Sequence, residues 1–194
     1  MDGPRGNAAT DDAALVAAVA SGDRGAYREL VRRHAAGIQR YAGRLVRDPT
    51  EAEDVTQETF LRLWLRARDY DPVARVTTWL FRIAHNLCID RLRARGRIEL
   101  LESPDAEQAP DSIGQPALLE SKQRAEALSA ALDALPPRQA SALSLVHLHG
   151  LSGVEAAEVL AVSPEALESL LSRGRRALKV RLSAGSSDRV EQSS

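Results

Sequence analysis

The chain has 194 residues, of which 44% are apolar and 27% charged, and its net charge is −1. These are the proportions of an ordinary folded protein and exclude a chain that is disordered throughout. Aromatic residues make up only 4% and glycine and proline together 21 residues, which argues against a large β-sandwich or a collagen-like chain and favours helices. No run of 18 apolar residues is present, and Met1–Gly6 lacks the apolar core of a signal peptide. The single cysteine, Cys88, permits neither an internal disulfide nor a cysteine-based zinc site, so we expect a cytoplasmic protein without membrane insertion.

The net charge conceals a partition along the chain. Residues 11–96 carry a balance of +3, residues 97–119 a balance of −4 and residues 120–182 a balance of +1. The acidic segment contains three prolines and few apolar residues, which indicates an extended linker. We therefore expect two domains, 11–96 and 120–182, joined by an acidic linker over 97–119.

Helices in the first block have clear start signals. Asp23 is in place to cap one helix, and Asp48, Pro49 and Glu51 supply a cap, a proline at the first helical position and a glutamate at the third. Apolar residues then recur at helical spacing. Together these signals predict helices at about 24–47, 49–64 and 77–95.

The third of these helices carries a polar stripe. On a wheel of about 100° per residue, one side about 80° wide holds Trp79, Arg82, Asn86, Asp90, Arg93 and Arg97. The opposite side is apolar and holds Leu80, Ile83, Ala84 and Leu87. Because arginine neutralises phosphate, aromatic rings stack on unpaired bases and amides bond base edges, the stripe suits a nucleic-acid strand. The alternative is a solvated face whose tryptophan borders the core.

The helix at 49–64 has a different residue pattern from the helix with the polar stripe. Acids dominate its first half, and its second half is crowded with Phe60, Leu61, Leu63, Trp64 and Leu65. Such a helix can bury one side and present Asp54, Gln57, Glu58 and neighbouring apolar groups to a partner. The alternative is that all of these residues serve the fold.

The second block has the pattern of a helix-turn-helix. A helix opens at Leu135–Gln139 and closes at Gly150, a Ser152-x-x-Glu155 capping box starts a short helix to about residue 160, and Ser163 starts a longer helix to about residue 182. Outward positions of the long helix are Glu165, Glu168, Ser169, Ser172, Arg173, Arg176 and Lys179, and inward positions are Leu167, Leu170, Leu171, Gly174 and Leu178. The outward face suits major-groove DNA, although a helical hairpin in an adaptor domain is an equal alternative.

Other candidate sites are weak. His147 and His149 point in different directions on a helix and have no third ligand nearby, which does not favour a metal site. Cys88 lies at the rim of an apolar arc and is interpreted as a small core residue. No phosphate-binding loop, nucleophile elbow or zinc-protease motif is present, so nothing argues for an enzyme, a cofactor or a metal.

The motifs together resemble a known family. Four segments, Asp48–Trp64, Thr78–Arg93, Leu135–Gln139 and the helix-turn-helix from Leu151, strongly resemble bacterial RNA polymerase sigma factors of the extracytoplasmic-function (ECF) subgroup. The resemblance covers residues 11–96 and 120–182. It implies an all-α protein in which the first domain is sigma region 2 and the second is sigma region 4.

The resemblance also implies partners and site residues. On the β′ coiled coil of core RNA polymerase it places Asp54, Gln57, Glu58, Phe60, Leu61 and Trp64. On the −10 element of promoter DNA it places Trp79, Arg82, Asn86, Asp90, Arg91 and Arg93. On the −35 element it places Glu168, Ser169, Ser172, Arg173, Arg176 and Lys179. Region 4 would also contact the β flap, the acidic linker would thread the polymerase channel, and an anti-sigma factor would restrain the protein. For the acidic segment, the alternative is a plain solvated linker.

Two features depart from the family pattern. Family members often carry basic residues near the start of the −35 helix, where this chain has Glu168 and Leu170, and a carboxylate there opposes phosphate. Gly174 inside the same helix costs about 1 kcal/mol relative to alanine, and we interpret it as permitting close packing. Two alternatives stay open: a stand-alone helix-turn-helix regulator, and a sigma-like decoy that occupies an anti-sigma factor without directing transcription.

Overall fold

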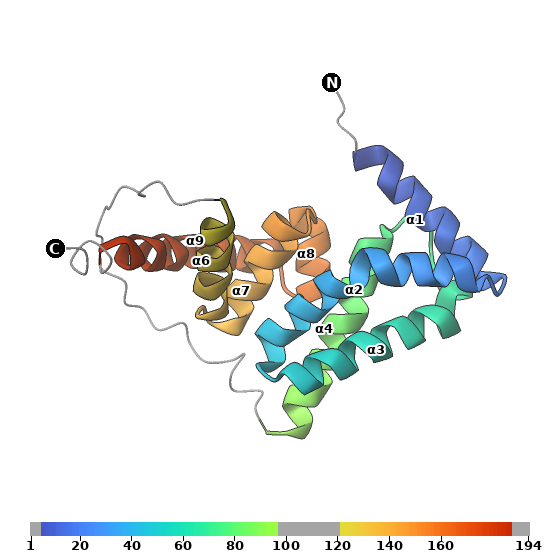
Figure 1. Ribbon diagram of the computed structural model, residues 1–194, viewed down its shortest axis with the longest axis horizontal. Helices are drawn as coiled ribbons and strands as arrows, with labels where there is room; N and C mark the ends of the chain where they lie inside the picture. The colour runs from blue at the N-terminus through green and yellow to red at the C-terminus, as the bar shows by residue number, and fades with distance from the viewer. Residues whose placement is uncertain (1–4, 97–120, 188–194) are drawn as a thin grey trace.

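The structure is a computed structural model that describes residues 5–96 and 121–187, and every regular element in those ranges is a helix or a helical turn. This confirms the predicted all-α fold. The predicted linker at 97–119 lies outside the described residues. The helices of the first block gather at one end of the molecule and those of the second block at the other (Figure 1).

The described part of the first block consists of α1 (Arg5–Ala20), α2 (Arg24–Val46), α3 (Pro49–Arg66), η1 (Ala67–Asp69) and α4 (Val76–Ala94). Both predicted caps are present. Oδ1 of Asp23 accepts hydrogen bonds from the backbone amides of Gly25 at 2.6 Å and Ala26 at 3.1 Å. Oδ1 of Asp48 likewise accepts from the amide of Thr50 at 2.9 Å, and Pro49 takes the first turn. The three predicted helices are confirmed to within two residues at each end.

The described part of the second block consists of α6 (Ser121–Asp133), α7 (Pro137–Leu143), the π-helical turn η2 (Ser144–Leu148), α8 (Gly153–Leu160) and α9 (Pro164–Ser187). The predicted capping box is formed: the amide of Glu155 donates to Oγ of Ser152 at 3.3 Å, and the amide of Ser152 donates to Oε2 of Glu155 at 2.8 Å. Gly150, with φ of +66°, turns the chain between η2 and α8.

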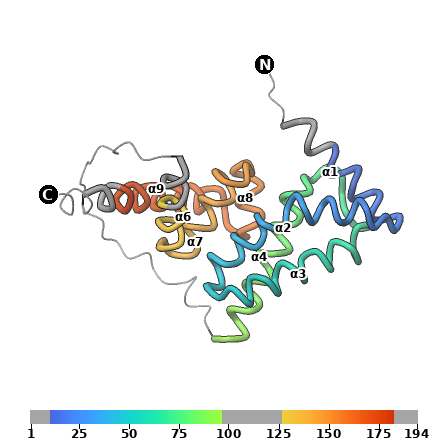
Figure 2. Tube along the Cα trace, in the orientation of Figure 1, coloured from blue at the N-terminus to red at the C-terminus, as the bar shows by residue number. Residues whose placement is uncertain are grey.

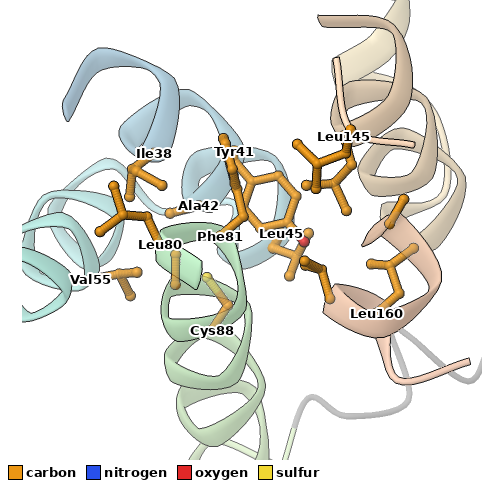
Figure 3. Close-up of a cluster of buried hydrophobic side chains, with 14 of the residues drawn as sticks. Ile38, Tyr41, Ala42, Leu45, Val55, Leu80, Phe81, Cys88, Leu145 and Leu160 are labelled. Atoms are coloured by element: carbon orange, nitrogen blue, oxygen red, sulfur yellow. The ribbon is translucent and has the colours of Figure 1, made fainter. Parts of the chain in front are cut away.

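The two blocks share one hydrophobic core. Helix α2 packs on α7, and α4 packs on α8, as the Cα trace also shows (Figure 2). Tyr41 and Phe81 are buried with ring centroids 5.2 Å apart in an edge-to-face pair. Figure 3 places these rings between residues of the first block, such as Leu80, and Leu145 and Leu160 of the second. The blocks are therefore packed against each other.

Gly174 is explained by the packing of α9 on α7. A Cβ atom at this position would lie 2.9 Å from Cδ1 and 3.2 Å from Cγ of Leu143, which is itself buried. The absence of a side chain thus lets the two helices approach closely, as interpreted from the sequence.

Candidate nucleic-acid and polymerase interfaces

The polar stripe predicted on α4 is present on the folded helix. Its exposed members are Arg82, Asn86, Asp90 and Arg93, and Trp79 is half-buried. The ring of Trp79 lies 5.2 Å from that of Tyr70, so the indole is held at the border of the core. The opposite side is buried through Leu80, Ala84 and Leu87, as expected, while Ile83 is half-buried. Arg97, the last predicted member, lies outside the described residues. We refer to Trp79, Arg82, Asn86, Asp90 and Arg93 as the α4 stripe.

The α4 stripe faces the second block. Nη1 of Arg82 lies 2.6 Å from Oε1 of Glu158 on α8. Further along α4, Asn86, Asp90 and Arg93 line a cavity of about 810 Å³. Its other walls include Arg62 of α3 and, from the second block, Arg138, Ser141, Leu160, Ala161, Val162 and Leu170. A cationic cavity with an apolar wall therefore lies between the two blocks.

Arg91 is separated from the α4 stripe. Its Nη1 lies 3.3 Å from Oδ2 of Asp54 on α3, and its side chain is only 29% exposed. The family resemblance implies that Arg91 contacts DNA and Asp54 the polymerase, and the structure brings these two side chains together. Neither wheel positions nor spacing along one helix indicates this pair, because it depends on how α3 and α4 cross.

The exposed face of α3 combines charge with apolar surface. Asp54 and Gln57 are exposed, Glu58 pairs with Arg62 at 2.9 Å, and Leu61 and Leu65 are 48% and 69% exposed. Trp64 packs edge to face on Tyr27 with ring centroids 5.4 Å apart. Phe60 differs from its expected place on this face: it is 3% exposed and belongs to the core. We call Asp54, Gln57, Glu58, Leu61 and Trp64 the α3 surface.

Helices α8 and α9 form the predicted helix-turn-helix. Ala161 takes a left-handed conformation with φ of +52°, and Oγ of Ser163 accepts from the amide of Ala166 at 3.2 Å to start α9. The face expected to be outward is exposed at all of Glu165, Glu168, Ser169, Ser172, Arg173, Arg176 and Lys179. The inward leucines at 167, 170 and 171 are buried. Hydrogen bonds from its own backbone amide and from Ser163 lower the pKa of Glu165, so this carboxylate is bound to the start of the helix.

Polar contacts between the blocks were not anticipated from the sequence. Oγ1 of Thr78 donates to Oε1 of Glu155 at 2.7 Å, and Nη1 of Arg75 donates to the carbonyl of Gly150 at 2.9 Å. On the other side of the core, Nη2 of Arg47 donates to the carbonyl of Leu135 at 3.0 Å. The acids at 155 and 158 fall on the outer face of a short amphipathic helix, which was a usable signal for a partner surface on α8.

His85, His149 and Cys88 are packed inside the fold. His149 lies against Phe81 with ring centroids 4.3 Å apart, and its Nε2 is buried without a hydrogen-bond partner. Nδ1 of His85 and the hydroxyl of Tyr41 form a buried hydrogen bond at 2.9 Å. Cys88 is fully buried, and burial raises its pKa to about 12, which confirms a core role. Among the described residues, no three His, Cys, Asp or Glu side chains gather as a metal site requires.

Comparison with known proteins identifies the class. Residues 30–98 match the model of sigma-70 region 2, and residues 125–178 match that of sigma-70 region 4. The ECF RNA polymerase sigma factor SigE of Mycolicibacterium smegmatis is 38% identical over 192 residues, which cover 98% of this chain and 72% of SigE. SigM of Mycobacterium tuberculosis is 32% identical and covers 86% of this chain and 82% of SigM.

Solved structures agree with the sequence matches. CnrH, solved in complex with the cytosolic domain of CnrY, has a TM-score of 0.60 and 30% identity and covers 89% of this chain and 97% of CnrH. The sigma factor RpoE of Bartonella quintana, solved with the anti-sigma factor NepR, shares the fold at a TM-score of 0.60 and 23% identity and covers 80% of this chain and 96% of RpoE.

The two family-model matches show that the chain contains sigma-70 regions 2 and 4. The similar sigma factors narrow the family to the ECF subgroup. The chain belongs to the ECF sigma factors, as its motifs indicated. Sigma factors as a family are not enzymes. In the part of the chain that the structure describes, no helix has the length and apolar character needed to span a bilayer.

The two interface histidines predict a pH dependence of stability. Burial lowers the pKa of His85 and of His149 from 6.5 to about 4, with neighbouring arginines acting in the same direction. Between about pH 4 and pH 6.5, the two histidines of the unfolded chain bind more protons than those of the folded chain. The contribution of the two neutral histidines to the free energy of unfolding is therefore complete above about pH 6.5. It is lost as the pH drops toward 4, by at most about 1.4 kcal/mol per pH unit for each histidine.

Urea unfolding at pH 7.5 and pH 5.0 measures this loss. His149→Gln should reduce the difference between the two midpoints, whereas His147→Gln, a change at an exposed residue, should leave it as in the parent chain. An equal midpoint shift in the parent and in His149→Gln would show that His149 does not contribute.

Proposed function

We propose that this protein binds core RNA polymerase and directs it to promoters through −10 and −35 elements, with region 2 at residues 11–96 and region 4 at residues 120–182. The observation that carries the proposal is the pair of amphipathic DNA-suited helices, α4 and α9, in a chain that belongs to the ECF sigma factors. Core polymerase is a cytoplasmic enzyme, so the protein acts in the cytoplasm and has no catalytic activity of its own.

The α4 stripe holds the opened −10 strand in this proposal. Arg82 and Arg93 neutralise phosphates, Trp79 offers its indole ring for stacking, and the amide of Asn86 bonds a base edge. Asp90, the remaining member, is an acceptor for a base amino group. Arg91, which pairs with Asp54 in the free protein, contacts a phosphate after release from that pair.

Helix α9 reads the −35 duplex. Ser169, Ser172 and Arg173 reach base edges from the first half of the helix, and Arg176 and Lys179 contact phosphates further along. Glu168 accepts from a cytosine amino group, which makes it a selective contact and a weak one. The five cations between Arg173 and Arg181 release counterions at about five phosphates, too few for tight selective binding by the free protein.

The α3 surface docks on the β′ coiled coil of the polymerase. Its exposed carboxylates and leucines suit a partner that is both basic and apolar. Phe60 supports this surface from the core and does not contact the partner. Region 4 binds the β flap, and the acidic linker at 97–119 follows the positive channel of the enzyme.

Binding energy drives promoter opening in this proposal. Opening about a dozen base pairs costs on the order of 15 kcal/mol at about 1.4 kcal/mol per step. The chain has no nucleotide-hydrolysing motif. The polymerase complex must therefore supply this free energy through contacts, and the free protein binds promoters poorly.

An anti-sigma factor restrains the protein. The related CnrH is solved with the cytosolic domain of CnrY, and the structurally similar RpoE with the anti-sigma factor NepR. A partner of this kind would bind the folded sigma factor and compete with the polymerase.

Reconstituted runoff transcription tests the proposed function. With core polymerase and genomic fragments, the protein should produce start sites that the core enzyme alone does not. A footprint on DNA without polymerase would instead favour a stand-alone regulator. Binding to an anti-sigma factor without any new start site would favour a decoy.

Two variants should separate opening from docking. Asn86→Ala removes a base contact and should reduce open-complex formation about tenfold while core binding stays unchanged. Asp54→Arg reverses a charge on the α3 surface and should weaken core binding at least about tenfold. Each variant is the control for the other, with permanganate reactivity and polymerase affinity as the measurements. Equal loss of both properties in both variants, with lowered melting temperatures, would mean misfolding and contradict the assignment.

A further inference from the structure

We propose that a cavity between α2 and the second block binds a small organic phosphate. The cavity has a volume of about 610 Å³, and its walls come from α2, α4, α6 and η2 together with His149. This volume is within the usual range for small-molecule sites. Among the described residues that line it, none belongs to the α4 stripe, the α3 surface or α9. The inference therefore goes beyond the proposed function and does not depend on it.

The wall of this cavity is positively charged. Its charged and titratable lining residues are Arg33, His34, Arg40, Arg44 and His149, and its described lining includes no aspartate or glutamate. The positive charge also acts on His149: burial is the largest cause that lowers its pKa to about 4, and Arg40 and Arg44 follow. A concave surface of one charge sign concentrates ions of the opposite sign, so the cavity favours an anion.

Two of the three arginines are available to an anion. Three carboxylates lie 2.7 to 2.9 Å from nitrogens of Arg33, so this residue is already neutralised. Arg40 is exposed, and no carboxylate of the described residues pairs with it. Arg44 is buried and only partly engaged. Its Nε lies 2.9 Å from Oδ1 of Asp133, and its Nη2 donates to Oγ of Ser129 at 3.3 Å.

Two buried nitrogen atoms of the lining residues have no hydrogen-bond partner in the described part of the chain. They are Nη1 of Arg44, whose side chain is 6% exposed, and Nε2 of His149. A buried donor without an acceptor is destabilising, and such groups are uncommon in folded proteins. Nη1 of Arg44 always carries protons, and Nε2 of His149 donates when the neutral ring is protonated there. The oxygens of a bound anion would supply the missing acceptors.

The donors and the apolar part of the wall together indicate an organic phosphate. Guanidinium groups bind phosphate through paired, charge-assisted hydrogen bonds, and a phosphate has more acceptor oxygens than a carboxylate. Leu128, Leu132, Leu148 and Phe81 line the rest of the cavity. Leu148 is 47% exposed, so an apolar group of the ligand would cover surface that otherwise meets water. Inorganic phosphate alone would leave this surface uncovered.

Titration calorimetry of the full-length protein with phenyl phosphate tests the proposal. Inorganic phosphate and phenol are the comparison probes, since each carries one half of the ligand. Phenyl phosphate should bind at least about tenfold more tightly than inorganic phosphate, because its ring buries apolar surface. Phenol should show no detectable binding. Absence of binding by phenyl phosphate, or equal affinities for phenol and phenyl phosphate, would overturn the proposal.

Three variants locate the binding site. Arg40→Gln removes an unpaired cation and should weaken phenyl phosphate binding at least about tenfold. Arg44→Lys keeps the charge and removes the planar guanidinium, and should weaken binding at least about fivefold. Arg28→Gln is the matched control, with the same charge change on an exposed residue of α2 about three turns from Arg40. It should change the affinity by less than about twofold, because salt screens charge over that distance.

Melting temperatures complete the design. Without ligand, Arg40→Gln should melt within about 2 °C of the parent chain, since Arg40 is exposed. Saturation with phenyl phosphate should raise the melting temperature of the parent and of Arg28→Gln, and raise that of Arg40→Gln less. Equal weakening of binding in Arg40→Gln and Arg28→Gln would overturn the proposal, because overall charge would then explain the binding. Displacement of phenyl phosphate by a short DNA duplex would also overturn it, because the cavity would then belong to a nucleic-acid surface.

Discussion

Packing of Tyr41 and Phe81 against the second block is the constraint on which the rest of the structure depends. These rings close the core of the first block and at the same time form the wall on which Leu145 and Leu160 are buried. His85, which hydrogen-bonds Tyr41, and His149, which lies on Phe81, sit in the same seam. Since both are kept neutral by burial, the seam is an apolar contact with two titratable groups inside it, and the position of α8 over α4 follows from it.

The three proposed surfaces are all accessible in the folded protein. One surface, on α3, is open to a protein partner, and another, on α9, is open to duplex DNA. On the α4 stripe, Asn86, Asp90 and Arg93 are exposed, while Arg82 pairs with Glu158 of the second block. Because this ion pair is exposed, it contributes little to stability, and the apolar seam holds the two blocks together.

Local chemistry made much of the fold predictable. Asp23, Asp48 and Ser152 cap helices as their sequence context indicated, and the amphipathic faces of α4 and α9 have the expected exposed residues. Helix α1 was missed because its alanine-rich sequence presents no narrow apolar stripe. Helix α6 was missed although Leu128 and Leu132, four residues apart, were a usable signal. Contacts between residues on different helices could not be predicted. The burial of Phe60, the Arg91–Asp54 pair and the Arg82–Glu158 pair depend on how helices cross, and spacing along one helix does not encode that.

The distance between the two blocks in the free protein tests most directly whether they share one core. Donor and acceptor dyes at Asp69 and Arg181, both exposed and on different blocks, report this distance by energy transfer. The account predicts one population with a single, narrow transfer efficiency in the native protein, which Phe81→Asp in the shared core should broaden. A broad distribution of efficiencies in the native parent protein would contradict it, because the two blocks would then move independently instead of packing as described above.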